Sequence, residues 1–191
     1  MSEDLVEPVS SGHYSQLKPH NLKKVVPPEK LRKVVDEMAA TIREDYRDKN
    51  PLVVGVLKGC FIFMADLTRR IDIPLEIDFI RVKSYGQKGE TRGELQLVKD
   101  LETDIRGRHV LLVEDIIDTG HTMAMLLELL KSRKPASLKV CALIDKGERR
   151  EKVVELDYTG IAIEQGFVVG YGLDYSECYR NLDGIYEVCF T

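Results

Sequence analysis

Three continuous apolar runs constrain the fold of this chain more than any other feature of its sequence. They cover residues 52–57, 109–113 and 138–143. Runs of this kind are typical of strands buried on both faces of a parallel sheet. Residues 60–70 can form a helix after the first run, and the stretch after Thr122 carries apolar residues at helical spacing. The alternation predicts an α/β fold, a doubly wound, mostly parallel central sheet with flanking helices.

The two ends of the chain depart from this pattern. Residues 1–20 mix Ser, Gly, Pro, His and charged residues without periodicity, which is typical of an arm. Pro27-Pro28 suits the start of a helix, and apolar residues then recur at helical spacing up to Ile42. Residues 157–191 hold short strand-like pieces among glycines and aromatic residues. We expect a single domain over residues 1–191, with a small hood built from N-terminal and C-terminal segments, the latter about 157–191.

Composition and charge argue against several classes of function. Lys plus Arg number 28 and Asp plus Glu number 32, so the formal net charge is −4. A general nucleic-acid coat would need clustered positive charge, and no apolar run approaches the length of a membrane span. The start of the sequence lacks the apolar region of a signal peptide, and the four cysteines show no metal-finger spacing. We expect a cytoplasmic protein with reduced thiols that binds neither nucleic acid nor membrane.

Residues that follow the predicted strands are the place to seek chemistry, because ligands in such sheets bind beyond the carboxyl ends of the strands. Glu114 and Asp115 leave the second strand, and residues 118–122 then open a helix with small and hydroxyl side chains. Amide groups at a helix start favour a bound phosphate. Vicinal carboxylates can accept hydrogen bonds from the two hydroxyls of a ribose, or hold Mg²⁺ through water. A diol beside a phosphate describes a 5-phosphoribosyl group.

Each half of this stretch also has a simpler interpretation when taken alone. Thr119 and Thr122 can cap a helix, and the Glu114-Asp115 pair can be a solvated strand end. Their order directly after a buried strand favours the phosphoribosyl site over both.

At residues 114–122 the chain resembles the signature of the phosphoribosyltransferases that bind phosphoribosyl pyrophosphate. Other segments resemble further motifs of this type I family, in the family's order, from about residue 52 to the C-terminus. They are the pyrophosphate loop at Leu57-Lys58-Gly59, the mobile catalytic loop at Ser84-Tyr85-Gly86, and a purine-binding hood at Lys146, 167–171 and 174–180. The set is similar to the hypoxanthine-guanine branch of the family.

The resemblance implies an enzyme of purine salvage. Such an enzyme transfers the 5-phosphoribosyl group from phosphoribosyl pyrophosphate to N9 of hypoxanthine or guanine, giving IMP or GMP and pyrophosphate. Positive charge develops on the ribose, because bond breaking runs ahead of bond making. The resemblance also implies Mg²⁺ as cofactor, with Glu114, Asp115 and Asp174 as the residues to hold it, and a homodimer or homotetramer.

The resemblance assigns catalytic and purine-binding roles to four residues. Asp118 faces purine N7 as the general base. Lys146 donates to the exocyclic O6 of the purine, and Phe167 stacks on the ring. The backbone carbonyl of Val168 accepts from N1–H or from the 2-amino group of guanine.

Further residues are assigned to the pyrophosphate, the ribose and the 5′-phosphate. Lys58 and Gly59 bind pyrophosphate after a cis peptide between Leu57 and Lys58, and Arg180 neutralises its charge. Ser84 and Tyr85 close over the pyrophosphate and exclude water, and Asp174 reaches a second Mg²⁺. The ribose and 5′-phosphate contacts fall to Glu114, Asp115, Asp118, Thr119, Gly120, His121 and Thr122. The His121 side chain fits a phosphate contact and a solvent-facing orientation equally.

Two other functions fit parts of the sequence. A regulatory protein of the same fold would sense phosphoribosyl pyrophosphate and bind RNA or DNA, but such regulators commonly lack a carboxylate at the position of Asp118. A phosphoribosyltransferase for another base is the second alternative. Lys146, Phe167 and Asp174 favour a 6-oxopurine instead.

Overall fold

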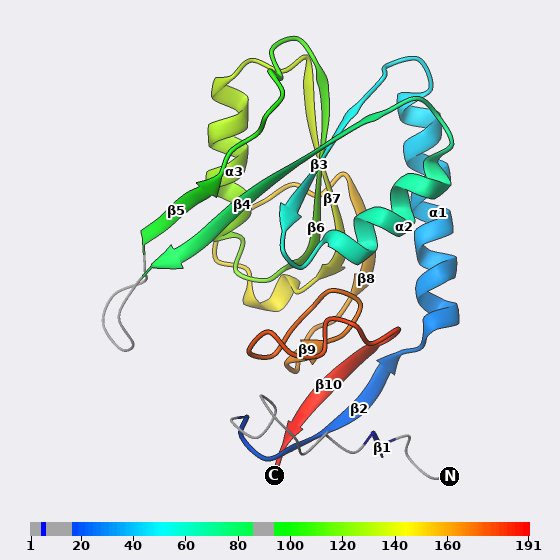
Figure 1. Ribbon diagram of the computed structural model, residues 1–191, viewed down its shortest axis with the longest axis vertical. Helices are drawn as coiled ribbons and strands as arrows, with labels where there is room; N and C mark the ends of the chain where they lie inside the picture. Colours follow the sequence, from blue (N-terminus) through cyan, green and yellow to red (C-terminus); the bar gives the residue numbers. More distant parts are fainter. Residues whose placement is uncertain (1–4, 7–16, 86–93) are drawn as a thin grey trace.

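A six-stranded sheet with the order β5-β4-β3-β6-β7-β8 forms the centre of the protein in a computed structural model that describes residues 5–6, 17–85 and 94–191 (Figure 1). Its strands are β3 (Leu52–Leu57), β4 (Glu76–Tyr85), β5 (Glu94–Lys99), β6 (His109–Ile117), β7 (Ser137–Asp145) and β8 (Tyr158–Ala162). β4, β3, β6, β7 and β8 pair in parallel, whereas β5 pairs antiparallel with β4. The predicted mostly parallel sheet is confirmed.

Helices cover both faces of this sheet. The helices α1 (Pro28–Tyr46) and α2 (Phe61–Ile71) pack on one face, and α3 (His121–Ser132) packs on the other (Figure 1). Successive residues of β3 therefore enter different cores. Val53 packs with α1 and α2, whereas Leu52 and Val54 pack in the cluster that includes α3. All three side chains are fully buried, as a strand between two helical layers requires.

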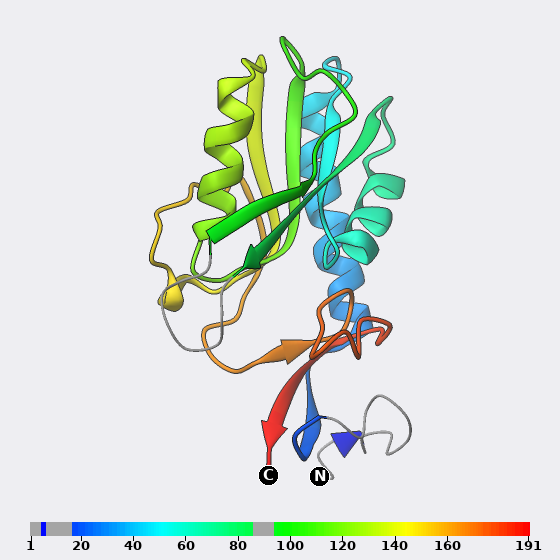
Figure 2. The same cartoon turned by 60° about the vertical axis from the view of Figure 1, so that its left-hand side comes forward.

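The hood is a second, antiparallel sheet with the order β1-β2-β10-β9, and it lies beyond one end of the central sheet (Figures 1 and 2). Its strands are β1 (Leu5–Val6), β2 (His20–Val26), β9 (Val168–Val169) and β10 (Ile185–Phe190). N-terminal and C-terminal segments thus both build the hood, as predicted. The buried His20 joins them, because its Nε2 lies 2.9 Å from the Tyr179 hydroxyl.

Strand β6 is longer than the sequence predicts. The apolar run ends at Val113, but the strand continues to Ile117, which pairs with Asp145 of β7. Glu114 and Asp115 consequently lie inside the strand rather than after it. Pairing with β7 overrides the low strand propensity of the two acidic residues.

The predicted boundaries of the hood and of the loop before β5 also need correction. Within the expected hood segment 157–191, β8 pairs in parallel with β7 and belongs to the central sheet, so the C-terminal part of the hood starts after it. Ser84 and Tyr85 end strand β4, whereas residues 86–93 of the predicted loop lie outside the described residues. Among the described helices, none combines the length and the apolar character needed to cross a membrane.

Candidate active site

Two adjoining hollows at the carboxyl ends of β3, β6 and β7 contain most of the predicted site residues. A cavity of about 340 Å³ lies between these strand ends and the hood, and one of about 270 Å³ lies at the start of α3. Predicted residues that line the first are Lys58, Gly59, Asp115, Asp118, Lys146, Phe167, Val168, Asp174 and Arg180. Those that line the second are Glu114, Asp115, Asp118, Thr119, Gly120 and Thr122. Asp115 and Asp118 border both hollows, so the two form one continuous site.

The Glu114-Asp115 pair lies buried at the junction of the hollows. A Cβ atom on Gly59 would come within 1.8 Å of Asp115 Oδ2, so glycine is the residue that lets the strand-end turn approach this carboxylate. Burial raises the pKa of both carboxyl groups, and the charge of Asp115 raises the pKa of Glu114 further. Binding a cation or the hydroxyl donors of a diol would stabilise their charged forms.

Asp118 has one paired and one unpaired carboxylate oxygen. Its Oδ2 lies 3.0 Å from Arg149 Nη1. Its Oδ1 is buried without a hydrogen-bond partner among the described residues. Buried acceptors are nearly always paired, so this oxygen at the border of the two hollows is a candidate to accept a hydrogen bond or a proton from a ligand.

The second hollow ends at the N-terminus of α3, where the first amide groups have no acceptor within the helix. Gly120 precedes the helix with φ of 85°, and a Cβ atom there would meet Lys152 O at 2.6 Å. Amide donors at this end of a helix favour an anion. The His121 Nε2 lies 3.0 Å from a Glu151 carboxylate oxygen. The phosphate contact of this side chain, one of the two orientations that fit the sequence, is not tested by that contact.

At the hood side of the first cavity, two cations and two carboxylates form a connected group. The predicted cis peptide between Leu57 and Lys58 is present. Lys58 Nζ lies 2.9 Å from Glu177 Oε2, and Arg180 Nη2 lies 3.1 Å from the same oxygen. Arg180 Nη2 also lies 2.8 Å from Asp174 Oδ1. Hydrogen bonds from Lys58 and then Arg180 hold the pKa of Glu177 below its usual value, so it stays ionised.

A buried lysine and a half-exposed aromatic ring form another part of this cavity. The Lys146 ammonium group is buried and donates to the carbonyl oxygen of Gly166. Phe167 is 45% exposed and forms a T-shaped pair with Tyr175, with 5.6 Å between the ring centroids. Val168 is buried at the start of β9. A cation beside a flat apolar surface suits a planar ligand that carries an acceptor.

Sequence reasoning missed three charged residues of the site. Arg149 pairs with Asp118, and Glu177 links Lys58 to Arg180. Arg150 donates to the carbonyl oxygens of Ile117 and Asp118 and to the Asp145 carboxylate. Arg149 and Arg150 stand in a charged stretch that is more typical of a solvated surface. Glu177 lies within the segment 174–180 that resembles the family, but nothing in its local pattern marks it as the partner of Lys58.

The predicted metal residues supply oxygen donors but do not gather at one point. The described residues contain no group of three or more His, Cys, Asp or Glu side chains placed to hold a metal. Mg²⁺ is usually held by one or two carboxylates, with water and substrate phosphates completing its shell. The buried Glu114-Asp115 pair and, separately, Asp174 fit that manner of binding. Of Ser84 and Tyr85 only the backbone is described, as the end of β4, so their roles stay predictions.

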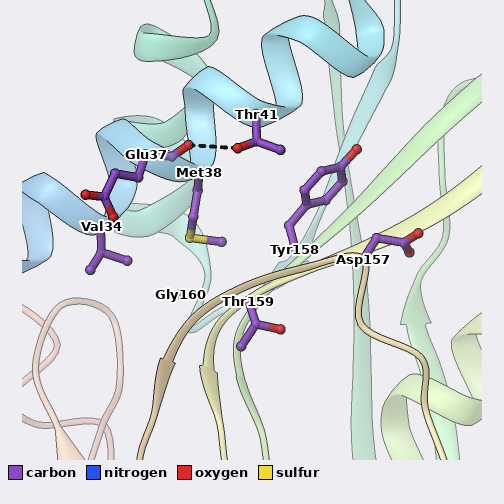
Figure 3. A pocket seen from close by; sticks show the side chains of 8 residues that line it. All are labelled: Val34, Glu37, Met38, Thr41, Asp157, Tyr158, Thr159 and Gly160. Carbon is purple, nitrogen blue, oxygen red and sulfur yellow. Dashed lines mark hydrogen bonds between the residues drawn. The ribbon is translucent and has the colours of Figure 1, made fainter.

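A separate hollow of about 260 Å³ lies between α1 and strand β8 (Figure 3). Val34 and Met38 reach into it from the helix, and Tyr158 and Thr159 come from the strand. None of the predicted site residues whose side chains are described lines it. The predicted chemistry is therefore concentrated at the strand ends that face the hood.

Comparison with known proteins agrees with this arrangement. The sequence profile of the phosphoribosyl transferase domain matches residues 23–176. The hypoxanthine-guanine phosphoribosyltransferase of Bacillus subtilis is 46% identical over 164 residues, which are 85% of this chain and 91% of that protein. The hypoxanthine phosphoribosyltransferase of Haemophilus influenzae is 43% identical over 175 residues, 90% of this chain and 98% of that protein. A crystal structure of a hypoxanthine-guanine phosphoribosyltransferase from Bacillus anthracis matches with a TM-score of 0.82 and 42% identity, covering 86% of this chain and 97% of that chain. This chain belongs to the phosphoribosyltransferase family and, within it, to the hypoxanthine-guanine branch.

Proposed function

We propose that this protein is a Mg²⁺-dependent hypoxanthine-guanine phosphoribosyltransferase of purine salvage. It transfers the 5-phosphoribosyl group of phosphoribosyl pyrophosphate to N9 of hypoxanthine or guanine, which makes it a glycosyltransferase. The observation that carries the proposal is the continuity of the two hollows through Asp115 and Asp118. A phosphate subsite, a diol subsite and a purine subsite then follow one another in the order of the groups in the substrates.

The helix start and the buried acids hold the phosphoribosyl group. Amides and hydroxyls of residues 119–122 bind the 5′-phosphate, because the N-terminal end of α3 presents unsatisfied donors. Glu114 and Asp115 accept hydrogen bonds from the ribose hydroxyls. Both side chains are buried, so a ribose or a cation supplies the partners that water would give an exposed carboxylate.

Pyrophosphate leaves from the hood side of the site. The bond between C1 of the ribose and the pyrophosphate oxygen breaks with its electron pair on pyrophosphate. Lys58 and Arg180 neutralise that charge, and Ser84 and Tyr85 close over it. Mg²⁺, held near Glu114, Asp115 and Asp174, supplies further positive charge when it is bound.

The purine occupies the cavity beside Lys146, Phe167 and Val168. Lys146 donates to O6, Phe167 stacks on the ring, and N9 attacks C1 as pyrophosphate departs. Asp118 accepts the N7 proton through Oδ1, which has no partner in the part of the chain that the structure describes, and this makes the base a better nucleophile. A regulator without catalysis has no use for a carboxylate at this place, so the site favours an enzyme over a sensor that binds nucleic acid.

A purine panel tests the proposal and makes the first prediction. Hypoxanthine and guanine, incubated with phosphoribosyl pyrophosphate and Mg²⁺, should yield nucleoside monophosphates, whereas adenine should not. The 6-amino group of adenine would face the Lys146 ammonium, donor against donor, in a buried place. Lys146→Met should slow the oxopurines rather than accelerate adenine. Equal use of adenine and hypoxanthine by the wild-type protein would contradict the 6-oxopurine assignment.

The proposal extends to location and assembly. We propose a cytoplasmic homodimer or homotetramer that forms one phosphoribosyltransferase domain per chain and works on small molecules alone. Phe61 of α2 and Ile77 of β4 are 45% and 49% exposed and lie on one apolar groove, which supports association. Size-exclusion chromatography with light scattering measures the assembly.

A further inference from the structure

The Glu177 carboxylate lies where the proposed site needs an anion. Its Oε2 lies 2.9 Å from Lys58 Nζ and 3.1 Å from Arg180 Nη2, the two side chains assigned to pyrophosphate. One oxygen thus bridges both cations. Lys58 and Glu177 stand 119 residues apart in the sequence, so the tertiary fold creates this contact.

The backbone around Glu177 is held in an unusual conformation that aims its side chain at the cations. Ser176 and Glu177 have φ of 50° and 67°, in the left-handed region that residues other than glycine rarely adopt. The Glu177 amide donates to Asp174 Oδ2 at 2.8 Å, which fixes the turn. The Glu177 side chain is 58% exposed, so a ligand from solvent can reach and replace it.

The Arg180 side chain and the Lys58 backbone are positioned independently of Glu177. Arg180 lies 2.8 Å from Asp174 Oδ1 and donates to the Gly172 carbonyl oxygen at 2.8 Å. The Lys58 backbone adjoins Gly59, and the carbonyl oxygen of Gly59 packs closely on Gly172. A Cβ atom on Gly172 would come within 2.0 Å of that oxygen. Loss of the Glu177 charge would therefore free the cations without releasing their backbone.

We propose that Glu177 occupies the Lys58–Arg180 clamp in the ligand-free protein and is displaced when a pyrophosphate group binds. This inference rests on the proposed function, since it takes the clamp to be the pyrophosphate site. Glu177 is then a positioning residue that sets the affinity of the clamp for anions. A single carboxylate yields to a pyrophosphate with several charged oxygens, whereas weaker anions compete poorly with it.

Calorimetric titration with inorganic pyrophosphate in the presence of Mg²⁺ tests the inference on the wild-type protein and Glu177→Gln. The variant keeps the shape of the side chain and removes the competing charge. The variant loses two exposed ion pairs, so pyrophosphate should bind to it about two- to thirtyfold more tightly. The KM for phosphoribosyl pyrophosphate should fall in parallel, and the thermal midpoint of the ligand-free variant should fall slightly, because the same ion pairs are lost there.

Glu44→Gln is the matched control. Glu44 is also 58% exposed and lies close to two arginines, Arg43 and Arg47, but it is on α1, away from the clamp. Its loss should leave pyrophosphate affinity unchanged. If Glu177→Gln fails to fold, Glu177→Asp is titrated with pyrophosphate instead, because its shorter side chain cannot bridge both cations from the same backbone.

Unchanged or weaker pyrophosphate binding in the folded Glu177 variant would overturn the inference. The titration uses no purine and no turnover, which separates it from the proposed function. Tighter binding in the variant together with no transfer to any purine would support displacement of Glu177 by pyrophosphate. It would contradict the proposed transferase activity.

Discussion

At the residue scale, Asp118 shows how one carboxylate can be both fixed and available. Its Oδ2 is held by Arg149 at 3.0 Å, which sets the orientation of the side chain. Its Oδ1 is left buried and unpaired among the described residues. An unpaired buried acceptor is unfavourable in the free protein, and a ligand that donates to it removes that penalty.

Asp118→Asn should lower turnover by about 10²–10⁴-fold while leaving affinity for phosphoribosyl pyrophosphate nearly intact. The amide keeps the size of the side chain but cannot accept the purine proton. Steady-state kinetics with hypoxanthine and a binding titration with phosphoribosyl pyrophosphate measure the two effects. Asp36→Asn is the control and should leave both quantities unchanged. Asp36 lies on α1 and pairs with Arg70 of α2. Near-normal turnover of the Asp118 variant would exclude it from proton transfer.

Site residues within the ordered motifs could be predicted from the sequence, whereas their partners could not. Asp118 and Lys146 follow buried strands at positions where ligands are expected, and the structure brings both to one cavity. Arg149 and Glu177 act through contacts with residues far away in the chain. Local sequence carries no information on which distant charge an exposed-looking arginine or glutamate will meet.

At the scale of elements, the predictable ones are those whose own sequence has a strong apolar pattern, either a continuous run or a helical stripe. The runs that became β3 and β7 and the apolar stripe of α1 are of this kind. The extension of β6 over two acids depends on pairing with β7, and the place of β8 in the central sheet depends on tertiary contacts. Such assignments are decided by neighbours in space, because β propensity depends on packing context.

Arg150 should hold the connection between β6 and α3, which forms the phosphate end of the site. Its guanidinium group lies 3.1 Å from the Asp118 carbonyl oxygen and 3.3 Å from that of Ile117, and it also bonds the Asp145 carboxylate. Arg150→Ala should lower the free energy of unfolding by about 1–3 kcal/mol, as measured by urea denaturation. Hydrogen exchange of residues 117–122 should become faster.

Arg108→Ala provides the comparison for this variant. Arg108 likewise joins a carboxylate, that of Glu76, to a backbone carbonyl oxygen, that of Asn50, but it does so before the start of β6. Its loss should leave exchange at residues 117–122 and affinity for phosphoribosyl pyrophosphate as they were. If both variants changed that segment equally, Arg150 would have only a general effect on stability.

At the scale of the whole molecule, the site joins two sheets. The central sheet contributes Glu114, Asp115 and Asp118 from β6 and the turn after it, and the hood side contributes Phe167, Asp174 and Arg180. A phosphoribosyl pyrophosphate molecule that touches both parts links them. Its binding should therefore stabilise the folded protein as a unit rather than one subdomain.

This linkage yields a prediction for the thermal midpoint and for Mg²⁺. A ligand at one hundred times its Kd stabilises a protein by about 2.7 kcal/mol. For a chain of this size that shift corresponds to roughly 5–10 °C. Phosphoribosyl pyrophosphate with Mg²⁺ should raise the midpoint by this amount, measured by differential scanning calorimetry.

The same ligand with excess chelator should raise the midpoint much less, because buried carboxylates and a polyanion then meet without a neutralising cation. Mg²⁺ alone is the control, and restoring it after chelation should restore both the midpoint and the transfer activity. An equal midpoint and full activity in excess chelator would show that the acids of this site bind the ribose without a metal.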